Sequence, residues 1–264
     1  MNSVTRGVID TIKDGIAILT LNAPTRKNAL SSEVRFALLA AMEKYVADPV
    51  CRVIVLTGAA QTFCAGGDVS EMKPPLGTTP REYAFPRMKA LHNSIRHIAA
   101  GPKPVVAAVE GHAAGAGMSL AAACDYVVAS DAACFVASFS RMGLVADCGL
   151  LWTLPNRVGH NKALDLLLTA RPLTAYEALQ NGLVDEVVPE GETLTRALEK
   201  AASYIAVAPL SIAFTKRIMA GAFQGLEDIL NNEFEWQAEL KASVDHKEAR
   251  DAFLQKRTPN FQGY

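Results

Sequence analysis

Residues 103–125, KPVVAAVEGHAAGAGMSLAAACD, constrain the fold of this chain more than any other stretch. They open with an apolar, β-branched run, Val105–Val109, which predicts a buried strand. A glycine turn at Gly115–Gly117 leads into the good helix formers Met118–Ala123. This order leaves backbone N–H groups unpaired and aimed at one point, which suits an anion or an oxygen that becomes negative during a reaction. The alternative is a turn that only connects two elements.

A second stretch repeats the arrangement earlier in the chain. Val53–Leu56 predicts another short buried strand, which runs through Thr57 and Gly58 into the glycine-rich segment 63–68, FCAGGD. Two strand-to-glycine-loop units, each offering one N–H, could together supply the two donors of an oxyanion hole.

Composition limits the class of protein. The chain has 264 residues, half of them hydrophobic, which is enough for one α/β domain or for one domain plus an appendage. Its formal net charge of −1 argues against nucleic acid as the main partner. No stretch approaches the roughly 18 uninterrupted apolar residues of a membrane span, and the N-terminus lacks the apolar core of a secretory signal. The five cysteines have no metal-ligand spacing. We therefore expect reduced thiols, no metal and a cytoplasmic location.

The remaining pattern divides the chain in two. Strand-like runs flank Lys13-Asp14-Gly15 as in a hairpin, and a helix capped by Ser31 or Ser32 follows. Beyond Glu192 the apolar spacing becomes helical throughout, including helices over 226–240 and 244–254. We expect an α/β core over residues 1–190 and a helical region over 191–264.

A helix predicted over Arg81–Ala100 carries several cations, among them Arg87. A solvated face is the favoured interpretation of these charges. His92 and His97 are five residues apart, a poor match to one helical face, so zinc is not expected there.

The two glycine segments, LTGAAQTFCAGGDVSEM and KPVVAAVEGHAAGAGMSLAAACD, together resemble the crotonase (enoyl-CoA hydratase/isomerase) superfamily. The resemblance runs from about Gly15 to Phe261. It implies a spiral of ββα units with a C-terminal helical region that packs across a trimer interface. It also implies trimers or dimers of trimers, an acyl-CoA substrate, and no cofactor beyond the coenzyme A of that substrate.

The resemblance assigns the oxyanion-hole N–H groups to Gly67 and Ala116, which would hold the thioester oxygen as it becomes an enolate oxygen. Enoyl-CoA hydratases position a water with two glutamates. At the corresponding positions this chain has Ser119 and Phe139, and neither side chain is a carboxylate base.

Asp147 offers a different carboxylate. It lies in FVASFSRMGLVADCGLLWTLPNRVG, which resembles the matching stretch of the epoxyphenylacetyl-CoA isomerases of phenylacetate degradation, and its position matches the catalytic aspartate of dienoyl-CoA isomerases. One carboxylate suffices for isomerisation, because it removes a proton from one carbon and returns it to another. The alternative is that Asp147 caps a helix beginning at Cys148 or Gly149.

Three functions stay open from the sequence. The first is an acyl-CoA isomerase that shifts a double bond or rearranges a ring through Asp147. The second is a hydratase with an unusual water arrangement. The third is a non-catalytic CoA-binding relative that acts through its trimer surface or binds RNA.

Substrate contacts also follow from the resemblance. It places Ala65 beside the adenine, Arg26 and Lys27 near the phosphates, and Lys256 near the phosphates of a neighbouring subunit's ligand. We expect an acyl pocket lined by Met72, Leu76, Met88, Phe139, Leu144 and Trp152.

Three further residues are assigned structural roles. Asp68 is expected to brace the first glycine loop, and Asp125 to support the end of the helix after the second. Cys148 is expected to pack in apolar surroundings that raise the pKa of its thiol.

Overall fold

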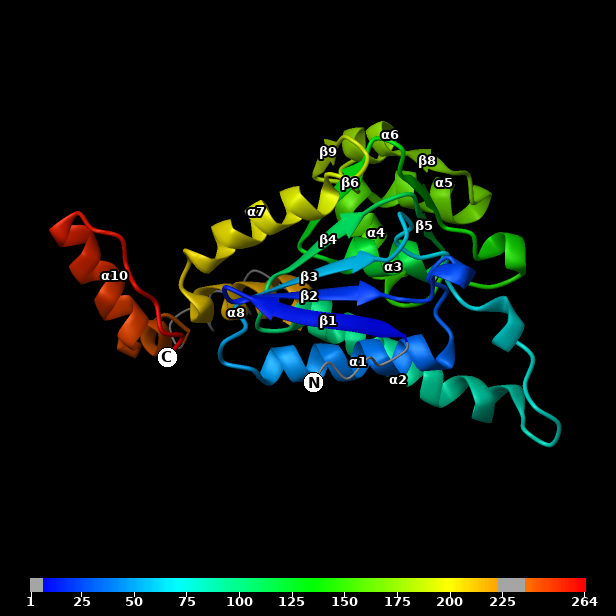
Figure 1. The fold of residues 1–264 in the computed structure, drawn as a ribbon, viewed down its shortest axis with the longest axis horizontal. Helices are drawn as coiled ribbons and strands as arrows, with labels where there is room; N and C mark the ends of the chain where they lie inside the picture. The colour runs from blue at the N-terminus through cyan, green and yellow to red at the C-terminus, as the bar shows by residue number, and fades with distance from the viewer. Residues whose placement is uncertain (1–6, 223–235) are drawn as a thin grey trace.

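The structure, a computed structural model, describes residues 7–222 and 236–264. Its centre is a six-stranded sheet (Figure 1). In spatial order the strands are β1 (Val8–Lys13), β2 (Ile16–Leu21), β3 (Val53–Gly58), β4 (Val105–Val109), β6 (Tyr126–Ser130) and β9 (Glu186–Val188). β1 is antiparallel to β2 in the predicted hairpin, and the other pairings are parallel. The two predicted strands that precede the glycine loops, β3 and β4, are therefore neighbours.

Helices cover both faces of this sheet. α1 (Ser32–Ala47), α2 (Pro80–Ala100) and α3 (Ala116–Ala123) lie on one face, and α7 (Thr193–Ile205) crosses the other (Figure 1). The alternation of side chains along a strand explains the division: on β3, Ile54 packs with the first group while Val53 packs against α7. Burial of both faces accounts for the continuous apolar runs that marked these strands in the sequence.

A smaller three-stranded sheet stands beside the first. It contains β5 (His112–Ala114), β7 (Cys134–Val136) and β8 (Leu173–Thr174). Three more helices follow its strands: α4 (Leu150–Val158), α5 (His160–Thr169) and α6 (Ala175–Gln180). Short helical turns complete the core: η1 (Pro24–Arg26), η2 (Val69–Glu71) and η3 (Ser140–Met142).

The C-terminal region is helical, as the sequence predicted. α8 (Pro209–Arg217) continues into the π-helical turn η4 (Ile218–Ala222), and α10 (Val244–Gln255) projects away from the sheet (Figure 1). The helix expected over 226–240 lies largely outside the described residues. The boundary at residue 190 stays a prediction, although α7 beyond it still packs on the sheet.

Within the described ranges, no single helix has the length and hydropathy of a membrane span, although α7 and the segment after it, bent by 105°, reach that threshold together by length and composition alone. The same residues contain no group of three or more His, Cys, Asp or Glu side chains that could hold a metal ion. All five cysteine thiols are free, and all but Cys134 are buried.

Candidate active site

The first glycine loop is joined to β5 by backbone hydrogen bonds. The Cys64 N–H donates to the His112 carbonyl (2.9 Å), and the Ala114 N–H donates to the Cys64 carbonyl (2.9 Å). This pairing carries the loop after β3 directly alongside the segment that leads into α3. The two glycine loops therefore lie side by side because of main-chain bonding rather than through particular side chains.

The other edge of the same loop is bonded to the chain before α1. The Leu30 N–H donates to the Gly66 carbonyl (2.7 Å), and the Ala65 N–H donates to the Lys27 carbonyl (2.9 Å). Asn28 is fully buried and donates through Nδ2 to the carbonyls of Ala59 and Thr62. Bonding on both edges fixes the backbone path through residues 64–67.

Close approach of the two loops requires glycine at specific positions. Gly66 has φ 95°, and a Cβ there would lie 2.7 Å from the Ala114 carbonyl oxygen. Gly115 precedes α3 with φ 50°. A Cβ on Gly117 would lie 2.3 Å from the Cys64 carbonyl oxygen. Both distances are shorter than a Cβ atom can adopt, so α3 packs on the loop only because Gly66 and Gly117 have no side chain.

The backbone N–H groups of Gly67 and Ala116 are left without an acceptor among the described residues. Ala116 is the first residue of α3, so its N–H has no partner within the helix. Both residues line one cavity of about 310 Å³. Two unpaired donors in one cavity, one of them at a helix N-terminus, form the kind of site that stabilises a developing oxyanion.

The structure brings seven of the predicted site residues together around this cavity: Ala65, Gly67, Met72, Ala116, Phe139, Leu144 and Asp147. The other lining residues were not predicted: Arg35, Gly66, Val69, Gly115, Ser138, Arg141 and Met142. Phe139 is buried, and it contributes an aromatic ring to the cavity lining.

Three residues expected in the acyl pocket do not line the cavity. Leu76 is fully exposed, and Met88 lines a separate hollow with Phe85 on α2. Trp152 is 45% exposed, because it lies on the outer side of α4. The inner side of this helix is formed by the buried residues Leu150, Thr153 and Leu154.

Asp147 reaches the cavity from the turn that precedes α4. Cys148 (φ 53°) and Gly149 (φ 75°) are both left-handed, so the chain reverses sharply before the helix begins at Leu150. The Asp147 backbone carbonyl accepts from the Leu150 N–H (3.1 Å) and from Ser119 Oγ (3.1 Å). The capping alternative is wrong, because the N-cap residue is Gly149 and no side chain caps the helix.

The Asp147 carboxylate is hydrogen-bonded to the Cys148 thiol, but one of its oxygens is left without a bond within the described part of the chain. Its Oδ1 is buried and has no hydrogen-bond partner among the described residues. Burial raises the pKa of the neighbouring Cys148 thiol, and the Asp147 carboxylate raises it further, as the sequence predicted. The thiol is therefore protonated at neutral pH. Among the residues that line the cavity, Asp147 is the single carboxylate.

Arg35 is the main site residue that the sequence did not reveal. It lies on the first turn of α1, and its Nε donates to the Leu30 carbonyl (2.8 Å). A Cβ built on Gly67 would lie 3.5 Å from the Arg35 guanidinium. Burial lowers the pKa of this guanidinium, and the nearby Arg87 cation adds to the effect.

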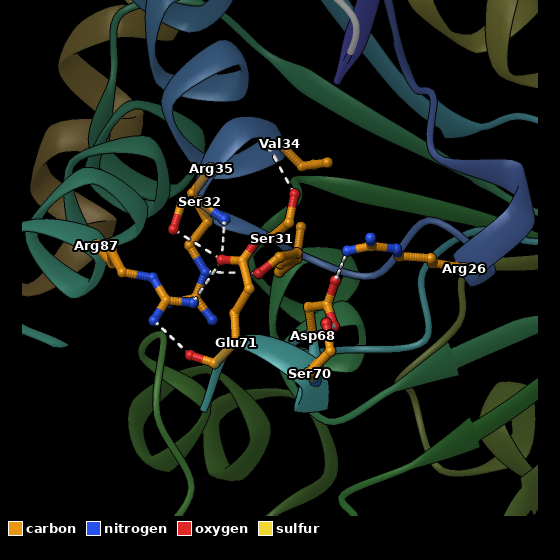
Figure 2. Close-up of polar contacts among 10 residues, drawn as sticks. Arg26, Ser31, Ser32, Val34, Arg35, Asp68, Ser70, Glu71 and Arg87 are labelled. Carbon is orange, nitrogen blue, oxygen red and sulfur yellow. Dashed lines mark hydrogen bonds and ion pairs between the residues drawn. The ribbon is translucent and has the colours of Figure 1, made fainter. Parts of the chain in front are cut away.

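A polar network beside the cavity fixes the turn η2 to two helices (Figure 2). Arg87 donates to the Glu71 carbonyl (2.9 Å) and to its Oε2 (3.0 Å), and the same oxygen accepts from the N–H and hydroxyl of Ser32. The expectation that Arg87 lies on a solvated face is wrong. Its side chain is only 9% exposed, and it both pairs with Glu71 and lies over the ring of Tyr83.

Asp68 braces the first glycine loop, which confirms that prediction. Its Oδ1 accepts from the Ser70 N–H (2.9 Å) and hydroxyl (2.6 Å), and its Oδ2 pairs with Arg26 (2.5 Å) (Figure 2). Asp125 is structural as well, since it accepts from the Val105 N–H and pairs with Lys216.

The residues expected to contact CoA fall in two places. Arg26 and Lys27 are exposed on the turn that is bonded to Ala65, so these three lie together at the edge of the cavity. Lys256 caps the C-terminus of α10, and this helix lies on the opposite side of the molecule from the loop after β3 (Figure 1). The single chain therefore does not bring Lys256 to the cavity.

Comparison with known proteins agrees with this geometry. The Enoyl-CoA hydratase/isomerase family model matches residues 11–264. The chain is 34% identical over 259 residues to 1,2-epoxyphenylacetyl-CoA isomerase of Escherichia coli, covering 97% of this chain and 98% of that protein. It is 38% identical to a probable enoyl-CoA hydratase of Rhodobacter capsulatus, covering 96% of each.

Among solved structures, an enoyl-CoA hydratase from Polaromonas superimposes with a TM-score of 0.90 at 36% identity, covering 96% of this chain and 99% of that one. The chain belongs to the enoyl-CoA hydratase/isomerase family and has the crotonase fold, as the sequence predicted. Enzymes of this family act on acyl-CoA thioesters.

Proposed function

We propose that the chain is an acyl-CoA isomerase that shifts a double bond or rearranges a ring by proton transfer, with Asp147 as the only base. The observation that supports this choice is that Asp147 is the one carboxylate among the cavity-lining residues, while Ser119 and Phe139 stand where a hydratase needs two. Isomerisation needs one base for both proton transfers, whereas hydration must also activate a water.

In the proposed mechanism, the Asp147 carboxylate removes a proton from a carbon of the acyl chain. The C–H electrons enter the conjugated thioester, and its oxygen becomes an enolate oxygen. The N–H groups of Gly67 and Ala116 donate to that oxygen, each contributing about 3 kcal/mol. Asp147 then returns the proton to a different carbon, so the formula of the substrate is unchanged and no water is added.

The assignments around this mechanism are proposals too. Ala65, Arg26, Lys27 and Lys256 are proposed to hold the coenzyme A part of the substrate, Lys256 from a neighbouring subunit. A trimer or a dimer of trimers would bring α10 of one chain toward the cavity of another. We also propose that the protein is cytoplasmic and that it needs no cofactor beyond the coenzyme A of its substrate.

The test is solvent deuterium exchange into a panel of enoyl-CoA and phenylacetyl-type thioesters. Loss of the base should slow exchange in Asp147→Asn by about 10²–10⁴-fold, while Asp165→Asn, on the exposed side of α5, should behave as the wild type. Exchange that survives Asp147→Asn would show that the base lies elsewhere.

Two further measurements identify the other two functions. Oxygen from solvent in the product would indicate a hydratase, the activity in the names of several relatives. Tight binding of acyl-CoA without turnover of any thioester would indicate the non-catalytic alternative.

A further inference from the structure

Arg35 is a cation in the cavity wall without a carboxylate partner among the described residues. Glu71, which contributes to its electrostatic surroundings, is already bonded to Arg87 and Ser32. Removing an unpaired guanidinium from water is costly, so such a group is retained where a ligand completes its hydrogen bonds.

The guanidinium of Arg35 is also held in place before any ligand arrives. Its Nε is bonded to the Leu30 carbonyl, and that carbonyl belongs to the segment paired with Gly66. Its Nη2 would lie 3.5 Å from a Cβ built on Gly67, the residue whose N–H is one of the two proposed oxyanion donors. A guanidinium that is already held by a hydrogen bond to a backbone carbonyl loses little conformational entropy when it binds an oxygen.

Asp147 and Arg35 line the same cavity, and the Asp147 carboxylate acts electrostatically on the Arg35 guanidinium, yet the two do not form an ion pair. The cavity lining therefore has one anion, Asp147, and two cations, Arg35 and the exposed Arg141, together with apolar side chains such as Met72 and Phe139. A purely hydrocarbon acyl chain satisfies none of these charges.

We propose that Arg35 is a specificity-determining residue that selects acyl chains carrying an acceptor oxygen, a carboxylate or a hydroxyl, near the reacting carbons. This proposal rests on the acyl-CoA isomerase function above. Arginine binds carboxylates through two parallel hydrogen bonds, and a site built for such a group discriminates against analogues that lack it.

The experiment uses three saturated five-carbon thioesters: pentanoyl-CoA, 5-hydroxypentanoyl-CoA and glutaryl-CoA. None has a double bond to move, so calorimetric dissociation constants report recognition independently of turnover. The wild type is compared with Arg35→Met, which removes the charge, and Arg35→Lys, which keeps the charge without the guanidinium. Arg96→Met removes an exposed arginine of α2 that does not line the cavity, and controls for net charge.

The wild type should bind glutaryl-CoA or 5-hydroxypentanoyl-CoA at least about tenfold more tightly than pentanoyl-CoA. Arg35→Met should abolish that preference with little change for pentanoyl-CoA, Arg35→Lys should retain part of it, and Arg96→Met should retain it all. Tighter binding of glutaryl-CoA identifies a carboxylate as the selected group, and tighter binding of the hydroxy compound alone identifies a neutral oxygen.

Equal binding of the three thioesters by the wild type would overturn the proposal, and so would a preference that survives Arg35→Met. Either result leaves the isomerase assignment standing, because that assignment depends on deuterium exchange. Conversely, exchange that persists without Asp147 would remove the proposed base while the binding preference still measures the role of Arg35.

Discussion

Substituting Gly117 by alanine tests whether contact between α3 and the first glycine loop holds the oxyanion donors in place. The added methyl group would lie 2.3 Å from the carbonyl oxygen of Cys64 and 2.8 Å from its Cβ. Ordinary contact begins at 3.4 Å, so the helix start must move by about 1 Å. Ala116, whose N–H is one of the two donors, is the adjacent residue and must move with it.

Two effects of opposite sign determine the stability of Gly117→Ala. Alanine within a helix is favoured over glycine by about 1 kcal/mol, whereas overpacking a tight core costs about 1–3 kcal/mol. The contact is with backbone that is itself paired to β5, so the cost should prevail and the variant should lose up to about 2 kcal/mol of unfolding free energy. A displacement of about 1 Å at the reacting centre should lower kcat about 100-fold.

Urea unfolding followed by circular dichroism gives the stability, and the deuterium-exchange assay gives the activity. Gly191→Ala serves as the control, since Gly191 has φ 86°, no neighbour near its added Cβ, and no place in the cavity lining. It should lose about 1 kcal/mol to backbone strain and keep its activity. A Gly117→Ala protein that is more stable than the wild type and fully active would refute the reasoning.

Two further predictions concern stability. Glu110→Ala should lower the unfolding free energy by about 2 kcal/mol in urea, because the Glu110 carboxylate accepts from the Thr193 hydroxyl (2.8 Å) and from two backbone N–H groups at the start of α7; an unchanged midpoint would contradict this. Hydrogen bonds from Ser70, and then the Arg26 cation, hold the pKa of Asp68 below 3.8 in the folded state. The unfolded chain then binds more protons, so the stability advantage of the wild type over Asp68→Asn should be constant above about pH 5 and shrink as the pH falls through the folded pKa. A difference that grows in acid would be the opposite sign.

The fold could be predicted because its main elements leave local signals. The apolar runs of β3 and β4 have the length of strands and each precedes a glycine loop, and Ser31 caps α1 as expected. The burial of Arg87 could not be predicted, because a charged residue on a helix is usually exposed and its partner Glu71 lies on a separate segment of the chain.

Part of the candidate site could likewise be predicted from the sequence, and part could not. Asp147 and the donors at Gly67 and Ala116 lie in continuous stretches of sequence, and the structure gathers them around one cavity. Arg35 escaped notice because its entry into the cavity depends on the loop after β3 folding back over α1. Leu76 was expected in the pocket but is fully exposed, because a resemblance in sequence does not determine how a side chain in this loop is oriented.

The oxyanion donors are main-chain atoms, and this has a consequence for how the protein tolerates change. An alanine scan would pass over Ala116 and would report on Gly67 only through an added methyl group, although both N–H groups are proposed to contact the reacting oxygen. The sensitive positions in such a scan would be Gly66 and Gly117, which touch no substrate in the proposed mechanism but set the backbone path. Replacing the backbone amide by an ester at Gly67 or Ala116 would remove a donor and leave every side chain as it was.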